Sequence, residues 1–226
     1  IHTTTSREDF MFQSTDVEIC PLLEKSLKNR EEEIQTTEIG SMITEVCRLD
    51  QTKALCEKFI NFKESNILKE FIVMIGEVNN SRFVGQDLIP DINLTAKLNL
   101  LNSIAVSKLY FSDPEETKFF TSEILSNIVS DLNSAKSSIE KKNNIHKKLI
   151  VLEGSDLMIF NLLHVFGFTN LKCLTDLYVN GTVSGNCYQM PSFASSVFIE
   201  LKEDADKKMY VQLKYNGSSL LLCHPD

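Results

Sequence analysis

The sequence predicts an α/β fold in which a large helical lobe is followed by a smaller piece made of one strand, one helix and a C-terminal hairpin. Three observations predict it. The first two-thirds of the chain places apolar residues at helical spacing. Residues 148–152 form a short, continuous apolar run, and residues 197–201 and 210–215 alternate apolar and polar side chains. We therefore expect a mainly α-helical cap lobe over residues 1–145 and the C-terminal part of an α/β core over residues 146–226.

The helical lobe divides into segments with recognisable starts and stops. We expect helices over residues 22–34, 38–49, 52–62, 65–78 and 91–110, a further helix that begins after Asp113, and an apolar helix over 157–168 in the second region. Pro21 and Pro114 stand at first-turn positions, where proline is favoured. The composition of residues 79–90 predicts a polar break. Apolar residues of the 91–110 helix form its stripe: Leu94, Leu98, Leu101, Ile104, Ala105 and Leu109.

The second region contains a predicted strand, and the rest of this sequence does not supply the neighbouring strands that its sheet would need. The run Leu149-Ile150-Val151-Leu152 is typical of a strand buried on both faces, in the middle of a large sheet. The hairpin over 197–215, with its charged turn at 203–208, adds only two strands. We therefore expect the missing strands to come from an N-terminal segment of the same fold, either a separate chain or an upstream segment. The start at Ile1, with no Met and no signal sequence, favours the same interpretation.

Composition and short motifs limit the functions to be considered. A net charge of −8 argues against a nucleic-acid partner, and the longest apolar run, at 157–168, is too short to span a membrane. Neither a cofactor motif nor metal-ligand spacing occurs, so no cofactor and no metal are expected. Six cysteines fit either disulfides or buried thiols. Four glycosylation sequons favour the secretory pathway, with an extracellular, cell-surface or lysosomal product: Asn79, Asn93, Asn180 and Asn216.

One short segment has the pattern of a functional site. Gly154-Ser155-Asp156 lies where the predicted strand ends and the next helix begins, an edge at which ligands bind in α/β sheets. A helix N-terminus there could hold a phosphate, and Asp156 could donate a proton to a leaving group. The alternative is that Ser155 or Asp156 simply caps the helix. His164 in the same helix has the pattern of a core or partner-facing histidine. The four arginines are scattered and form no phosphate clamp.

The closing stretch of the chain resembles a known family. Gln189-Met190-Pro191-Ser192-Phe193-Ala194-Ser195-Ser196, followed by the strand pair that ends in Tyr215-Asn216-Gly217, is similar to the close of the histidine acid phosphatases of the lysosomal and prostatic type. The segment 147–156 resembles the strand that leads into that family's Ser-Ala-His-Asp motif. His2-Thr3-Thr4, Glu8-Asp9 and Cys20-Pro21 resemble its entry into the helical cap. The likeness covers the whole chain, closely in the last 80 residues or so and loosely through the helices.

The resemblance implies a histidine-phosphatase-like α/β core, which hydrolyses phosphate monoesters through a phosphohistidine. The family's nucleophile lies in an Arg-His-Gly-x-Arg-x-Pro motif that falls before the point matching Ile1, and this chain contains no Arg-His-Gly. Asp156 matches the family's proton donor, whereas Ser155 stands where the family has histidine. Cys20 matches a cysteine bridged near the C-terminus, which implies Cys20–Cys223. Cys47–Cys56 then follows from proximity in the sequence, which leaves Cys173–Cys187; the cysteine count alone leaves the pairing open.

Two functional hypotheses follow. The first is a secreted or surface glycoprotein that resembles a histidine acid phosphatase, is catalytically impaired and serves in binding or assembly, with a homo-oligomer or larger assembly expected. Ser155 motivates it, because a serine cannot carry the charge of an imidazolium opposite a phosphoryl oxygen. The second is the C-terminal chain of a processed two-chain acid phosphatase, active once paired with its N-terminal part. Asp156 motivates this alternative. An unrelated helical binding module would require the likeness of the final hairpin to be a coincidence.

Overall fold

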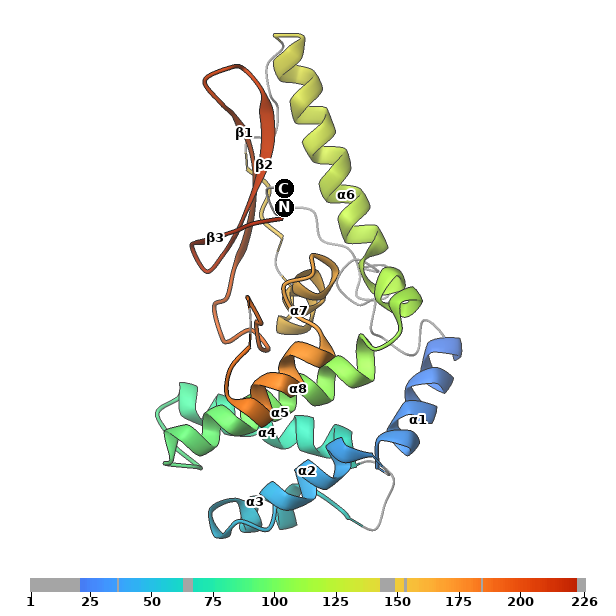
Figure 1. Cartoon of the computed structure of the whole chain (residues 1–226), viewed down its shortest axis with the longest axis vertical. Helices are drawn as coiled ribbons and strands as arrows, with labels where there is room; N and C mark the ends of the chain where they lie inside the picture. Colours follow the sequence, from blue (N-terminus) through green and yellow to red (C-terminus); the bar gives the residue numbers. More distant parts are fainter. Residues whose placement is uncertain are drawn as a thin grey trace. The chain divides into compact units, whose positions relative to one another are not determined.

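The computed structural model describes residues 21–35, 37–62, 67–142, 149–152, 154–183 and 185–222. It is mostly helical, with one small antiparallel sheet (Figure 1). The chain divides into two compact units, which are taken separately here. The helical unit holds the described residues of 21–117 and 167–190. The hairpin unit holds those of 118–166 and 191–222, so the division falls within one long helix.

The helical unit contains α1 (Pro21–Gln35), α2 (Glu38–Val46), α3 (Asp50–Phe59), α4 (Ile67–Phe83), α5 (Ile92–Tyr110) and α8 (Leu171–Asn180). Helix α5 is its centre, since α1, α2, α4 and α8 all contact it. Asp91 caps α5, because its carboxylate accepts hydrogen bonds from the backbone N–H groups of Asn93 (2.9 Å) and Leu94 (3.1 Å). At the other end of α5, the guanidinium of Arg30 donates to the carbonyl of Leu109 (2.7 Å), one of the last carbonyls of the helix.

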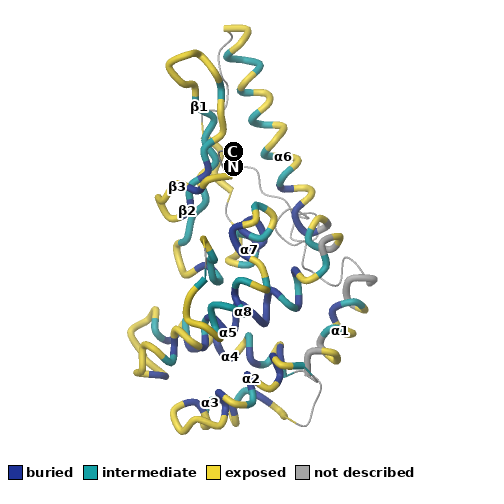
Figure 2. The backbone as a smooth tube through the Cα atoms, in the orientation of Figure 1, coloured by how far each residue is buried: buried dark blue, intermediate teal, exposed yellow. Residues whose placement is uncertain are grey.

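Helix α5 is buried on nearly every side over residues 98–109. Leu98, Leu101, Ile104, Ala105 and Leu109, which belong to the predicted stripe, are all buried, and Figure 2 shows much of this part of the helix in the colour of buried residues. The positions between them are buried too, since α8 adds a further neighbour to those that one stripe would need. A helix covered all round carries small or hydrogen-bonded polar residues among its apolar ones. The stripe was therefore predicted correctly except at Leu94, which is only half-buried, whereas its width was underestimated.

Helix α8 was missed by the sequence analysis. Its start is a capping box in which Asn170 Oδ1 accepts from the N–H of Cys173 (2.8 Å), and its end is Gly181 in the left-handed conformation. The chain after α8 returns to α5, where the N–H of Met190 donates to the hydroxyl of Ser103 (2.9 Å). These contacts place 167–190 in the helical unit. The units thus differ from the division predicted at residue 145, because α8 packs on α5.

The hairpin unit contains most of α6 (Pro114–Glu140), all of α7 (Asp156–Val165) and the sheet. Asp113 begins α6 as the sequence predicts, because its carboxylate accepts from the N–H of Glu115 (2.8 Å) and Pro114 occupies the first turn. Side chains of α6 and α7 form the small core of this unit: Ile124, Leu125, Ile128, Met158, Leu162 and Phe166. The predicted apolar helix at 157–168 is therefore present, shorter by a few residues at its C-terminal end.

The C-terminal hairpin is confirmed and extended. Strand β1 (Val197–Glu203) pairs antiparallel with β2 (Met209–Tyr215), which pairs with a short β3 (Ser218–Leu220), in the order β1-β2-β3. The register of β1 against β2 runs without a bulge, from Val197 opposite Tyr215 to Glu203 opposite Met209. In β1 and β2 the odd-numbered positions carry most of the apolar side chains and the even-numbered positions carry charged, polar and aromatic ones, as the alternation predicts.

Two local predictions are corrected. The expected buried strand at 148–152 is wrong for the part that the structure describes, because 149–152 form no strand and both Leu149 (78% exposed) and Val151 (77% exposed) lie at the surface. The physical reason is that no strand pairs with this segment within the described residues. The expected break at residue 79 is also displaced, since α4 continues to Phe83. Among the described residues, none of the helices has the length and apolar character needed to cross a membrane.

Candidate functional site

The predicted Ser155–Asp156 site lies at the N-terminus of α7 and is open to solvent. Ser155 is the N-cap residue, in an extended conformation, and its carbonyl accepts from the N–H groups of Met158 (3.1 Å) and Ile159 (3.4 Å). Its hydroxyl makes no capping hydrogen bond. The carboxylate of Asp156 accepts from the N–H of Leu157 (2.8 Å), and both side chains are exposed. Asp156 therefore stabilises the start of the helix, as an acidic residue in the first turn does.

The other half of the expected site is the strand that should precede it. Because 149–152 are exposed and not in a sheet, the structure holds the helix of the predicted strand–site–helix arrangement without its strand. The carboxylate of Asp156 is exposed at the surface. A phosphoryl group would additionally need donors on its other oxygens. In this unit the backbone N–H groups at the start of α7 are such donors, and the hydroxyl of Ser155 is a neutral one.

His164 lies further along α7 and belongs to the packing of the helix. Its Nδ1–H donates to the carbonyl of Phe160 (3.0 Å), and its ring meets the Phe160 ring edge-on at 4.5 Å between centroids. Burial lowers the pKa of His164 from 6.5 to about 4, against a smaller opposing effect of the Phe160 hydrogen bond. The imidazole is thus neutral near pH 7. His2, His146 and His224 lie outside the described residues.

Two of the scattered arginines have structural partners in the helical unit. Arg30 binds the end of α5, and Arg82 forms an ion pair with Asp87 (3.1 Å). In the part of the chain that the structure describes, no three histidine, cysteine, aspartate or glutamate side chains gather into a metal-binding group. A shallow hollow occurs on α6, and its lining does not include Ser155 or Asp156: Ser126, Val129, Ser130, Asn133, Ser134 and Ser137.

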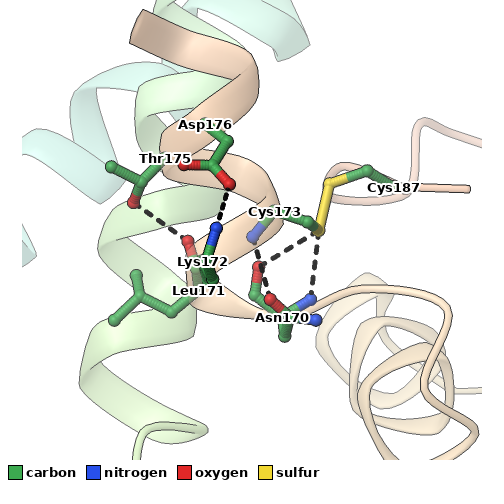
Figure 3. Close-up of polar contacts among 7 residues, drawn as sticks. All are labelled: Asn170, Leu171, Lys172, Cys173, Thr175, Asp176 and Cys187. Carbon is green, nitrogen blue, oxygen red and sulfur yellow. Dashed lines mark hydrogen bonds and ion pairs between the residues drawn. A yellow bond between two sulfur atoms is a disulfide. The ribbon is translucent and has the colours of Figure 1, made fainter. Parts of the chain in front are cut away.

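The structure joins two of the three expected cysteine pairs. Cys47 is bonded to Cys56 between α2 and α3, and both are buried. Cys173, in the first turn of α8, is bonded to the half-buried Cys187. The N–H of Asn170 donates to the sulfur of Cys173 at 3.3 Å (Figure 3). The first bridge joins two consecutive helices, and the second fastens the segment after α8 to the start of that helix. Cys20 and Cys223 lie outside the described residues.

The four sequon asparagines differ in what holds their side chains. Asn180 is exposed at the end of α8, and its hydroxyl partner Thr182 is exposed as well. Asn93 is exposed in the first turn of α5. The side-chain carbonyl of Asn216 accepts from the N–H of Ser196 (2.8 Å) in the β2–β3 turn. Asn79 is half-buried in α4, and its Nδ2 donates to Oδ1 of Asn99 on α5 (2.9 Å). Asn180 is thus the best-presented acceptor.

Sequence reasoning missed the residues that attach the segment after α8. Ser103 was considered as part of the long helix only, although its hydroxyl links Met190 to α5 while donating to the carbonyl of Asn99 (2.8 Å). Asn170 was not considered, although asparagine three residues before a cysteine, followed by apolar residues, is a usable N-cap signal. The outer edge of β1 was also overlooked.

Comparisons with known proteins identify no relative of this chain. No protein-family model matches the chain, and no curated protein and no solved structure matches it either.

Proposed function

We propose that this chain is a secretory-pathway glycoprotein whose fold is of the histidine-acid-phosphatase type and whose role is binding or assembly, with catalysis impaired. The observation that carries the proposal is the chemistry at the start of α7. Asp156 is placed as a first-turn carboxylate, and the neighbouring Ser155 offers a neutral hydroxyl where the resemblance expects an imidazole. Loss of one charged contact to a developing phosphoryl charge costs on the order of 10²–10³ in rate. Such a site can still hold an anion weakly while turning it over poorly.

The two disulfides support the compartment. Both form between cysteines that the fold brings together, which is the arrangement found in proteins of oxidising compartments. The exposed Asn180-Gly181-Thr182 sequon at the end of α8 is compatible with a glycan there. Expression through the secretory pathway should therefore add a glycan that an endoglycosidase removes. We expect Asn180→Gln to abolish the corresponding mass shift, whereas Asn79→Gln should change it least, since Asn79 is held between α4 and α5. A protein that carries no glycan would count against the proposal.

The catalytic part is tested by phosphomonoesterase assays at acid pH on the native protein. We expect turnover of a general aryl phosphate to be no greater than that of Asp156→Asn, a variant that keeps the size of the side chain and removes its acid function. Ser155→His is the gain-of-function control, because it supplies the imidazole that the resemblance implies. Robust turnover by the unmodified protein, lost in Asp156→Asn, would refute catalytic impairment.

One observation favours the alternative of a two-chain phosphatase. The apolar segment 149–152 immediately precedes the Ser155–Asp156 site and is exposed, as would be expected if another polypeptide supplied the strands beside it. Under this alternative the native material contains a second polypeptide with an Arg-His-Gly-x-Arg-x-Pro sequence. Native mass spectrometry of the purified protein, combined with peptide sequencing, would detect it. Amide exchange at residues 149–152 should then be slow in the native material and become fast when the second polypeptide is removed.

A further inference from the structure

Strand β1 ends the sheet, and among the described strands only β2 pairs with it. The order of the sheet is β1-β2-β3, so the other side of β1 is an edge. The seven residues of β1 contain no proline, and their register against β2 is continuous, so the strand carries neither of two devices that keep an edge from pairing. A regular edge of this length can accept another strand.

The backbone groups at this edge can be identified from the ladder. The N–H of Asn216 donates to the carbonyl of Ser196, and that of Asp204 donates to the carbonyl of Lys208. In an antiparallel pair, hydrogen-bonded positions alternate with non-hydrogen-bonded ones. The even-numbered residues of β1 therefore point their backbone groups at β2, and the odd-numbered residues point theirs outward: Val197, Ile199, Leu201 and Glu203.

The side chains of the sheet would also gain from an added strand. On the odd-numbered face, Ile199 and Leu201 are only half-buried, and Val211, which lies opposite Leu201, is 40% exposed. On the even-numbered face, Glu200 forms ion pairs with Lys202 (3.0 Å) and with Lys214 (2.9 Å). A partner strand would cover more of the first face and would place its own charges beside Glu200 and Lys202 on the second.

The charges of β1 make this edge complementary to itself. Glu200 and Lys202 are two positions apart on the same face. If two copies of β1 pair antiparallel around a two-fold axis at Leu201, Glu200 of each copy lies opposite Lys202 of the other. An axis at Glu200 would place two glutamates opposite each other, and an axis at Ile199 would place Glu200 opposite Phe198. Opposite charges at directly facing positions stabilise a strand pair, and like charges destabilise it. The Leu201 register is the favoured one.

We propose that this chain forms a two-fold symmetric dimer in which the β1 strands of two copies pair antiparallel around Leu201 and join the two sheets into one. A second copy satisfies the outward backbone groups of Ile199, Leu201 and Glu203 in both strands at once and forms two Glu200–Lys202 pairs by symmetry. The proposal rests on the sheet alone and does not depend on the phosphatase resemblance or on the state of Ser155.

The first test is sedimentation of the full, disulfide-bonded protein over a range of concentrations at physiological salt. We expect a monomer–dimer equilibrium. Lys202→Glu should raise the dissociation constant at least about tenfold, because it removes two cross-strand ion pairs and creates two repulsions. Lys214→Glu is the matched control. It makes the same charge change and also removes a partner of Glu200, but Lys214 lies on β2 and away from the edge. It should change the dissociation constant less than about threefold.

The second variant tests the backbone pairing. Ile199→Pro removes an outward N–H that the β1–β2 ladder does not use, so the hairpin should remain folded, as its circular dichroism will show, while the dimer weakens at least about tenfold. Ile199→Ala keeps the N–H and should leave most of the association.

The register is tested by mixing two single variants, Glu200→Cys and Lys202→Cys, under mild oxidation and identifying the linked peptides. The mixture should form the heterodimer that joins the cysteine introduced in one variant to the cysteine introduced in the other, in preference to either homodimer. A protein that stays monomeric up to millimolar concentration, or a dimer that both Lys202→Glu and Ile199→Pro leave unchanged, would overturn the proposal. Preferential Glu200→Cys homodimers would overturn the register.

Discussion

The helical unit and the hairpin unit differ in how far their apolar segments are buried. In the helical unit, four other helices contact α5, and the apolar residues from Leu98 to Leu109 are buried. In the hairpin unit, the apolar run 149–152 is exposed, and the seven-residue strand β1 pairs on one side only among the described strands. Composition alone does not separate these regions. The difference shows that burial depends on whether the described chain supplies neighbours, which it does for α5 and does not for 149–152.

The largest expected effect comes from shortening a buried side chain of the helical unit, and it is compared with the effect of shortening an exposed side chain of the hairpin unit. Leu101 is fully buried in α5, so Leu101→Ala should lower the free energy of unfolding by about 2–5 kcal/mol, through lost burial and a residual cavity. Val151→Ala removes methyl groups from an exposed segment and should change the free energy of unfolding by less than about 0.5 kcal/mol. Urea denaturation followed by far-ultraviolet circular dichroism measures both. Equal losses would mean that residues 149–152 are covered in the protein under study.

The second prediction concerns His164 in helix α7 of the hairpin unit and the dependence of stability on pH. The folded-state pKa of His164, about 4, is below the unfolded value of 6.5, so the unfolded chain binds the proton more readily. The stability that follows from the neutral imidazole is complete above about pH 6.5 and is lost as the pH falls toward 4, up to about 3 kcal/mol in total. Stability measured between pH 7 and 4 should therefore decline less steeply in His164→Gln. Identical slopes for the two proteins would contradict a half-buried histidine that the folded protein keeps neutral.

A smaller effect is expected where the segment after α8 meets α5. Ser103→Ala should lower the free energy of unfolding by about 1–3 kcal/mol, because it leaves the partly buried N–H of Met190 without its acceptor. Ser107→Ala, also at a buried serine of α5, is the comparison variant for loss of a hydroxyl. Hydrogen exchange should show faster exchange at Met190 in Ser103→Ala only. Unchanged exchange there would show that this hydrogen bond does not hold the segment.

The sequence predicted the elements whose signals are local. Asp91 and Asp113 mark helix starts that the structure retains, and the alternation in 197–215 predicted the hairpin. It could not predict what depends on distant neighbours. The run at 149–152 has the composition of a buried strand, and nothing local reveals whether other strands lie beside it. Helix α8 was missed although its apolar residues recur at helical spacing, and its position depends on packing against α5 and on the Cys173–Cys187 bridge.

The position of the candidate site could be predicted from the sequence, whereas the surroundings of the site could not. The change from an apolar run to a helix correctly located Ser155 and Asp156 at the start of α7. Their exposure could not be read from the sequence, because it depends on how 149–152 are covered. The pattern of β1 predicted which face of the strand is apolar, whereas the edge position of the strand became evident only from the strand order.

The central claim, a phosphatase-like chain with impaired catalysis, is tested most directly by the acid phosphomonoesterase activity of the native protein measured beside Asp156→Asn. The account predicts no difference between the two, since Asp156 serves the helix N-terminus and Ser155 offers no cationic contact. Robust turnover by the native protein that falls about 10²-fold or more in Asp156→Asn would contradict it, because that loss is expected when a working proton donor is removed.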